Sequence, residues 1–90
     1  MRQPSSRKTI GIIDGQGGGI GSTIIKKIKA SFGESVEIIA LGTNAIATAQ
    51  MLKAGANRGA SGENAIVRTV ARVDVVVGTL GVMLALSLIH

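Results

Sequence analysis

The chain has no cysteine, tyrosine or tryptophan, one phenylalanine and one histidine. The absence of cysteine excludes disulfides and thiolate metal sites, and it fits a reducing, cytoplasmic location. His90 stands alone, so a histidine-based catalytic triad or zinc site cannot be assembled. The core must therefore pack from aliphatic side chains.

Length and charge set further limits. Ninety residues make one small domain, which buries only about 60–65% of the surface of its unfolded chain. We expect a flexible basic tail over residues 1–7 and a folded domain over 8–90. The uncharged stretch 75–89 is shorter than the roughly 20 residues that span a bilayer, so we expect no membrane association. The net charge of +5 attracts phosphate groups of any kind.

A glycine-rich stretch organises the chain. The apolar run Thr9 to Ile13 predicts a buried strand, and a helical pattern begins at Gly19. Between them, five glycines fall within seven residues: Gly15, Gly17, Gly18, Gly19 and Gly21. A glycine turn between a strand and a helix is typical of loops that bind phosphate.

Helical periodicity continues to Phe32, where Gly33 is expected to end the first helix. One stripe of this helix is apolar and is expected to face the core: Ile20, Ile24, Ile25 and Ile28. Three lysines are expected to face water: Lys26, Lys27 and Lys29.

The second half of the chain alternates apolar and helical segments. The expected order is a strand over 36–41, a helix over 45–54, a brief edge strand over 56–60, a helix over 62–72, a strand over 73–77 and a helix over 80–89. Thr43 or Asn44 is expected to cap the helix over 45–54. Ser61 is expected to cap the helix over 62–72, with Ile66 and Val70 facing inward. This alternation predicts an α/β, Rossmann-like three-layer domain with a short parallel sheet of three to four strands. Nucleotide-binding domains of this class usually have more strands, so we expect a domain that is either minimal or incomplete at its C-terminus.

In loops of this type, one glycine makes the turn, another admits the phosphates and a third allows close packing. Two glycine spacings of the short-chain dehydrogenase type fit equally well. Gly15, Gly18 and Gly21 fit G-x-x-G-x-x-G, and Gly15, Gly19 and Gly21 fit G-x-x-x-G-x-G. We expect this loop to bind a nucleotide or dinucleotide, with NAD(P) as one candidate, or another phosphate-bearing small molecule. The candidate binding residues are Asp14, Gly15, Gln16, Gly17, Gly18, Gly19, Ile20 and Gly21, with Thr43 and Asn44 near the sugar. The alternative is that the glycines only form a tight turn.

Three missing groups limit the chemistry. No acid follows the second strand to hold a ribose, and without tyrosine the Tyr–Lys pair of short-chain dehydrogenases cannot form. Gly17 and Ser22 occupy the lysine positions of an ATPase phosphate loop, leaving only Thr23 for a metal, which disfavours ATP hydrolysis. Asp14 either contacts a ligand or caps the glycine turn. We assign no catalytic residue.

Other readings remain open. Glu63 and Asn64 either begin a helix or contact a ligand, and Arg58 either reaches a phosphate or is solvated. The chain could instead be an interaction module without ligand that forms a homo-oligomer through its apolar C-terminal segment. Binding of nucleic acid through the three lysines is disfavoured, because aromatic stacking residues are lacking.

Four segments together resemble one family of small bacterial proteins, the domain of unknown function 3842. They are Ile-Asp-Gly-Gln-Gly-Gly-Gly-Ile-Gly over 13–21, Glu-Ile-Ile-Ala-Leu-Gly-Thr-Asn over 37–44, Met-Leu-Lys-Ala-Gly-Ala-Asn over 51–57 and Gly-Glu-Asn-Ala-Ile-Val over 62–67. The resemblance runs from about residue 8 to the end and implies a Rossmann-like protein with no established activity. Family members often carry lysine at the position of Ser22 and proline at that of Thr79, and they continue through a further strand and helix.

Overall fold

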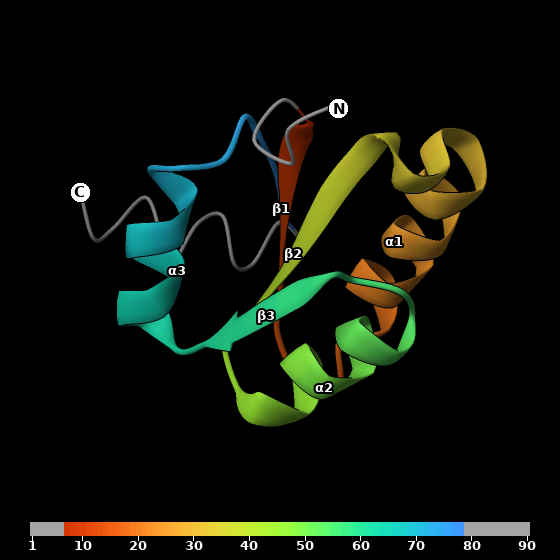
Figure 1. The fold of residues 1–90 in the computed structure, drawn as a ribbon. Coiled ribbons are helices and arrows are strands. Elements are labelled where there is room, and N and C mark those ends of the chain that lie inside the picture. The colour runs from red at the N-terminus through yellow and green to blue at the C-terminus, as the bar shows by residue number, and fades with distance from the viewer. Residues whose placement is uncertain (1–6, 79–90) are drawn as a thin grey trace.

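The apolar runs of the sequence form three strands of a four-stranded parallel sheet, and the remaining strand is the short segment Arg58–Ser61 (Figure 1). The structure is a computed structural model and describes residues 7–78. In chain order its elements are β1 (Lys8–Asp14), α1 (Gly19–Phe32), the 3-10 turn η2 (Gly33–Ser35), β2 (Val36–Gly42), α2 (Ala45–Lys53), β3 (Arg58–Ser61), α3 (Glu63–Val70) and β4 (Val75–Gly78).

The strand order is β3-β2-β1-β4, with every pair parallel. β1 and β2 pair along their full lengths, from Lys8 beside Val36 to Asp14 beside Gly42. The chain moves outward from β1 through β2 to β3 and then returns to the other side of β1. The strand order therefore reverses between β1 and β4, and ligands of open α/β sheets bind beyond the carboxyl ends of the strands at such a point.

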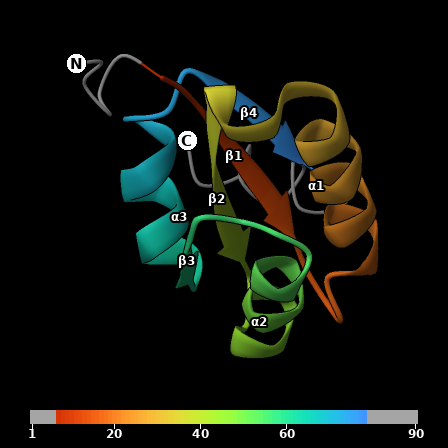
Figure 2. The same cartoon turned by 45° about the vertical axis from the view of Figure 1, so that its right-hand side comes forward.

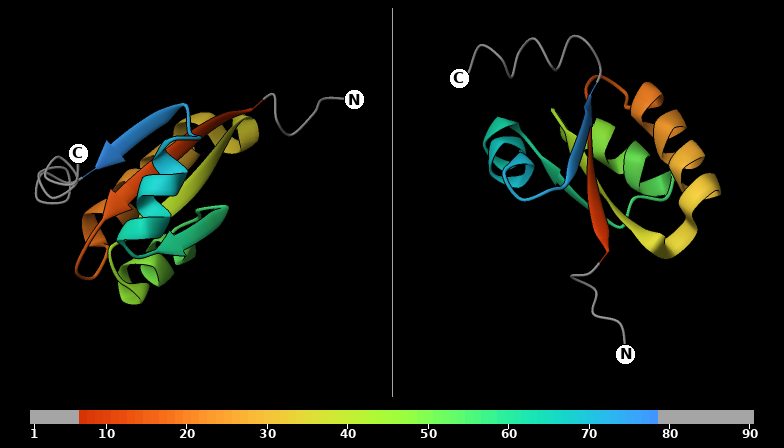
Figure 3. Two further views of the ribbon diagram at one scale, coloured as in Figure 1. Left: turned by 90° about the vertical axis from the view of Figure 1, so that its left-hand side faces the viewer. Right: turned by 90° about the horizontal axis from the view of Figure 1, so that it is seen from above.

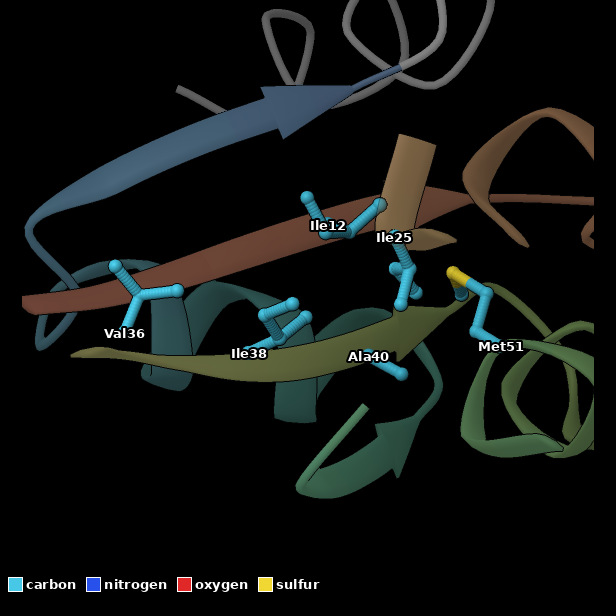
Figure 4. Close-up of a cluster of buried hydrophobic side chains, with 6 residues drawn as sticks. All are labelled: Ile12, Ile25, Val36, Ile38, Ala40 and Met51. Carbon is cyan, nitrogen blue, oxygen red and sulfur yellow. The ribbon is translucent and has the colours of Figure 1, made fainter. Parts of the chain in front are cut away.

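Helices cover both faces of the sheet. Figures 2 and 3 show α1 and α2 on one face and α3 on the other. Because side chains alternate along a strand, Ile12 packs toward α1 and α2 while Ile13 packs toward α3. Figure 4 shows the buried cluster on the first face: Ile12, Ile25, Val36, Ile38, Ala40 and Met51. The predicted Rossmann-like three-layer fold is confirmed.

The caps of the first two helices also follow the sequence. α1 ends where Gly33 adopts a φ of 57°, and the Gly33 amide donates to the Lys29 carbonyl. α2 begins at Asn44, whose Oδ1 accepts from the Ala47 amide at 2.8 Å. Of the two expected caps, Asn44 is thus the one used.

The prediction that Ser61 caps the third helix is wrong. Ser61 is the last residue of β3, and its hydroxyl donates to Thr48 Oγ1 at 2.8 Å on the α2 side. Gly62 stands at the N-cap with a φ of 94°, and α3 ends at Val70 rather than Arg72. Strand pairing of Ser61 with Gly42 outweighs its local capping tendency.

The prediction that Ile20 belongs to the core stripe is also wrong, because 64% of Ile20 is exposed. Gly21 is buried in its place, so the inward side of the first turn of α1 is a glycine. Ile24, Ile25 and Ile28 pack against the core as expected. Among the lysines, Lys26 and Lys27 are exposed, whereas Lys29 is partly buried beside Glu34.

The remaining strands lie close to their predicted places. The brief edge strand is shifted to Arg58–Ser61, and the last strand to Val75–Gly78. The expected helix over 80–89 and almost all of the expected tail over 1–7 lie outside the described residues. Within 7–78, no helix has the length and apolar character needed to cross a membrane.

Candidate functional site

The glycine loop leaves β1 through a tight turn and enters α1. The Gly18 amide donates to the Gly15 carbonyl at 2.9 Å, and the Ser22 amide donates to the Gly18 carbonyl at 2.9 Å. Gln16 has a φ of 49°, an uncommon value for a residue with a side chain. Gly18 is the N-cap of α1, with a φ of 75°.

Two glycines of the loop face inward and serve the fold. A Cβ on Gly18 would lie 2.6 Å from the Ala47 carbonyl oxygen, at the start of α2. A Cβ on Gly21 would lie 2.7 Å from Met51 Sδ and 2.9 Å from Asp14 Oδ2. These glycines therefore let α1 approach α2 and the end of β1, which is the packing role that the sequence assigned to one glycine of the loop.

Asp14 is buried beneath the loop, with 5% of its surface exposed. Its Oδ1 accepts from the Gly15 amide at 2.8 Å, and its Oδ2 accepts from the Gly21 amide at 2.6 Å. The carboxylate thus joins the first residue of the turn to the first turn of α1. Of the two roles considered for Asp14, this geometry is that of a cap.

Two other glycines, Gly17 and Gly19, face outward. Both are exposed, neither has a positive φ, and a Cβ on either would meet nothing within 4 Å among the described residues. The amides of Gly19 and Ile20, which begin α1, donate to no group within residues 7–78. The N-terminus of α1 therefore offers two unengaged N–H groups beside open backbone.

The loop after β2 lies directly against the glycine loop. The Thr43 amide donates to the Asp14 carbonyl at 2.9 Å. Gly42 leaves no room for a side chain, because a Cβ there would run into Thr48 Oγ1. Thr43 and Asn44 are exposed. The side-chain Oδ1 of Asn44 accepts the capping hydrogen bond, while its NH₂ group is unengaged within the described residues. The structure thus brings both residues to the glycine loop.

One residue of this region was missed by the sequence reasoning. Ile46 lies in the first turn of α2 and is 69% exposed, similar to Ile20 in the first turn of α1. The two helix starts touch through Gly18 and Ala47. An isoleucine two residues after an N-cap, off the buried stripe of α2, was the available signal.

The other candidate residues fall in three different places. Glu63 and Asn64 are exposed at the start of α3, where the Gly62 amide donates to the Gly42 carbonyl at 2.9 Å. Arg58 is not brought to the glycine loop, since its Nε lies 3.1 Å from Glu37 Oε2. Ser22 Oγ is buried without a hydrogen-bond partner among the described residues, so it does not reach the exposed side of the loop.

The lysines of α1 do not form one free basic cluster. Lys29 Nζ donates to Glu34 Oε2 at 3.0 Å and holds the pKa of that carboxyl below its usual value. Lys26 and Lys27 remain exposed. A metal-binding group of three or more histidine, cysteine, aspartate or glutamate side chains is not found in the described part of the chain.

Comparison with known proteins places the chain in a family. No curated protein and no solved structure matches it. The model of one protein family, described as a domain of unknown function, matches residues 9–90, which is nearly the whole chain. The β1–α1 loop, the capped start of α2 and the parallel sheet all lie within this match, and the chain belongs to the domain of unknown function family DUF3842.

Proposed function

We propose that the β1–α1 loop binds the phosphate of a nucleotide or dinucleotide. The observation that carries this proposal is that only some glycines of the loop are needed for packing. Gly18 and Gly21 account for the fold, whereas Gly17 and Gly19 meet nothing on their outward side. Their exposed backbone adjoins the unengaged amides at the N-terminus of α1, where the helix dipole favours an anion.

The surroundings favour an organic phosphate over the free ion. Ile20 and Ile46 are 64% and 69% exposed at the two helix starts that meet at the loop. Covering such side chains with a flat base or sugar ring removes apolar surface from water, at about 25 cal/mol per Å². Thr43 and the NH₂ group of Asn44 are placed to bond a sugar hydroxyl beside them.

Asp14 limits how strongly an anion can bind. Its carboxylate already engages the Gly21 amide, so a phosphate has only the earlier amides of α1 and must tolerate a negative charge beneath the loop. We therefore expect Asp14 to be a positioning residue, and we expect affinity to depend on the base and sugar as well as on the phosphate.

A thermal-shift panel tests this proposal with NAD, NADP, ATP, GTP, a flavin nucleotide and inorganic phosphate. A ligand at 100 times its dissociation constant adds about 2.7 kcal/mol to the free energy of unfolding, which raises Tm by more than about 10 °C for a domain of this size. We expect one nucleotide to stabilise the protein and inorganic phosphate to have less effect.

The variants follow from the geometry. Gly17→Val and Gly19→Val fill the open side of the loop and should abolish the shift, while Ala30→Val adds bulk to an exposed position farther along α1 and should retain it. Ile46→Ser should weaken the nucleotide shift and leave any phosphate shift unchanged. If no nucleotide stabilises a chain that melts cooperatively, the proposal fails.

A further inference from the structure

A second recess lies on the other face of the sheet, away from the glycine loop. It is a cavity of about 210 Å³ beneath α3, lined by Thr9, Ile39, Arg58, Ala60, Thr69 and Arg72. Thr9 is near the beginning of β1, Thr69 is in the last turn of α3, and Arg72 lies in the turn after α3 that returns the chain to the amino edge of the sheet. The recess is therefore separate from the carboxyl edge, where the glycine loop lies.

Two arginines line this recess, Arg58 from β3 and Arg72 from the turn that follows α3. Arg58 is matched by Glu37, through Nε at 3.1 Å and Nη2 at 3.4 Å. That pairing engages two of the five N–H donors of the guanidinium. Arg72 is exposed and forms no ion pair within residues 7–78, so its guanidinium is unengaged in the part of the chain that the structure describes.

The other nearby acid, Asp74, is bonded to Thr9 but keeps its negative charge. Asp74 Oδ2 accepts from the Thr9 amide at 2.7 Å and from the Thr9 hydroxyl at 3.0 Å. The hydroxyl hydrogen of Thr9 is thereby used, while Thr69 adds a hydroxyl to the wall. The remaining lining is apolar, since Ile39 and Ala60 belong to or pack against the buried cluster on this face.

From this combination we propose that the recess binds a short aliphatic carboxylate, with the carboxyl group on Arg72 and the apolar body against Ile39 and Ala60. The guanidinium of Arg72 has no ion-pair partner among the described residues, and a guanidinium fork binds carboxylate oxygens in a bidentate manner. The volume is below the 300–1,000 Å³ of typical ligand pockets, so a whole nucleotide does not fit.

The test uses amide NMR spectra of the full chain titrated with butyrate at constant ionic strength, with inorganic phosphate as the competing oxyanion. We expect saturable shifts at Ala60, Thr69 and Arg72, with a dissociation constant on the order of millimolar. Arg72→Gln should weaken butyrate at least about 10-fold, because a charged hydrogen bond is lost. Arg68→Gln changes an exposed arginine of α3 that does not line the recess, and it should leave butyrate binding unchanged.

A third variant tests the charge balance itself. Glu37→Gln releases Arg58 and removes one negative charge beside the recess, which should strengthen phosphate binding several-fold relative to butyrate. The proposal is overturned if phosphate and butyrate act equally on the wild-type protein, or if Arg68→Gln weakens binding as much as Arg72→Gln. Saturable butyrate shifts lost only in Arg72→Gln establish the site, whatever the outcome of the nucleotide panel.

Discussion

Each end of the central strand β1 is held by an aspartate that accepts backbone N–H groups, but the two sites differ in burial. At the carboxyl end, Asp14 is buried and binds the amides of Gly15 and Gly21. At the amino end, Asp74 is exposed and binds the amide and hydroxyl of Thr9. Water can replace the partners of Asp74 more readily than those of Asp14, because the bond from the Gly21 amide is buried.

The proposed anion sites at the two edges differ in the same way. The carboxyl edge offers backbone amides and glycines without side chains, so the binding of a ligand there depends on the backbone conformation of the loop. The amino edge offers two arginines on the surface, where charge matters more than shape. We therefore expect substitutions of the inward-facing Gly18 and Gly21 at the carboxyl edge to affect folding and binding together, and substitution of the exposed Arg72 at the amino edge to affect binding alone.

The largest expected effect is that of Gly18→Val. A side chain must adopt a φ of 75° and lies within 2.6 Å of the Ala47 carbonyl oxygen. Strain in the left-handed region and overpacking together cost about 3 kcal/mol or more. Urea unfolding should show this loss, and a wild-type midpoint would contradict the close contact between α1 and α2.

Asp14→Asn should follow, with a loss of about 2 kcal/mol. The side chain keeps its shape, but its NH₂ group must face one of two buried backbone donors. The same change at Asp74 should cost much less, because that carboxylate is exposed. Chemical denaturation of both variants measures the difference directly, and equal losses would remove the contrast between the two edges.

Gly19→Ala should leave stability unchanged or raise it by about 0.5 kcal/mol. The new Cβ enters open space at a helical position, and alanine restricts the unfolded chain. Thermal melts without ligand test this expectation. Marked destabilisation would mean that the outward side of the loop is packed, which would also remove the basis for a ligand there.

The smallest expected effect is the pH dependence contributed by Asp74. Its hydrogen bonds from Thr9 hold its pKa below the usual value. The stabilisation is therefore complete above the unfolded pKa of about 3.9, and it disappears as the pH falls through the folded value. The stability difference between wild type and Asp74→Asn should shrink on acidification below about pH 4, whereas a constant difference would place its origin elsewhere.

The sequence predicted most of the fold because its signals are local. Apolar runs located β1 and β2, and Gly33 and Asn44 marked helix ends by their own backbone preferences. Ser61 misled because strand pairing, a long-range interaction, determines its hydrogen bond. Ile20 misled because helical periodicity gives the apolar face but not which turn of that face lies over the sheet.

The candidate site was predictable as a stretch, but not in its internal roles. Five glycines look alike in sequence, and only the contacts of their missing side chains separate Gly18 and Gly21 from Gly17 and Gly19. Ile46 and the pairing of Arg58 with Glu37 depend on neighbours from other elements, which spacing along the chain does not reveal.

The contacts between the glycine loop and α2 bear on how this edge opens. Gly18 is pressed against Ala47, and the Thr43 amide is bound to the Asp14 carbonyl, so neither loop can swing out alone. The amide hydrogens of Gly18, Gly21 and Thr43 should therefore exchange with solvent through one shared opening event and at similar rates. A ligand that holds either loop closed would slow exchange in both.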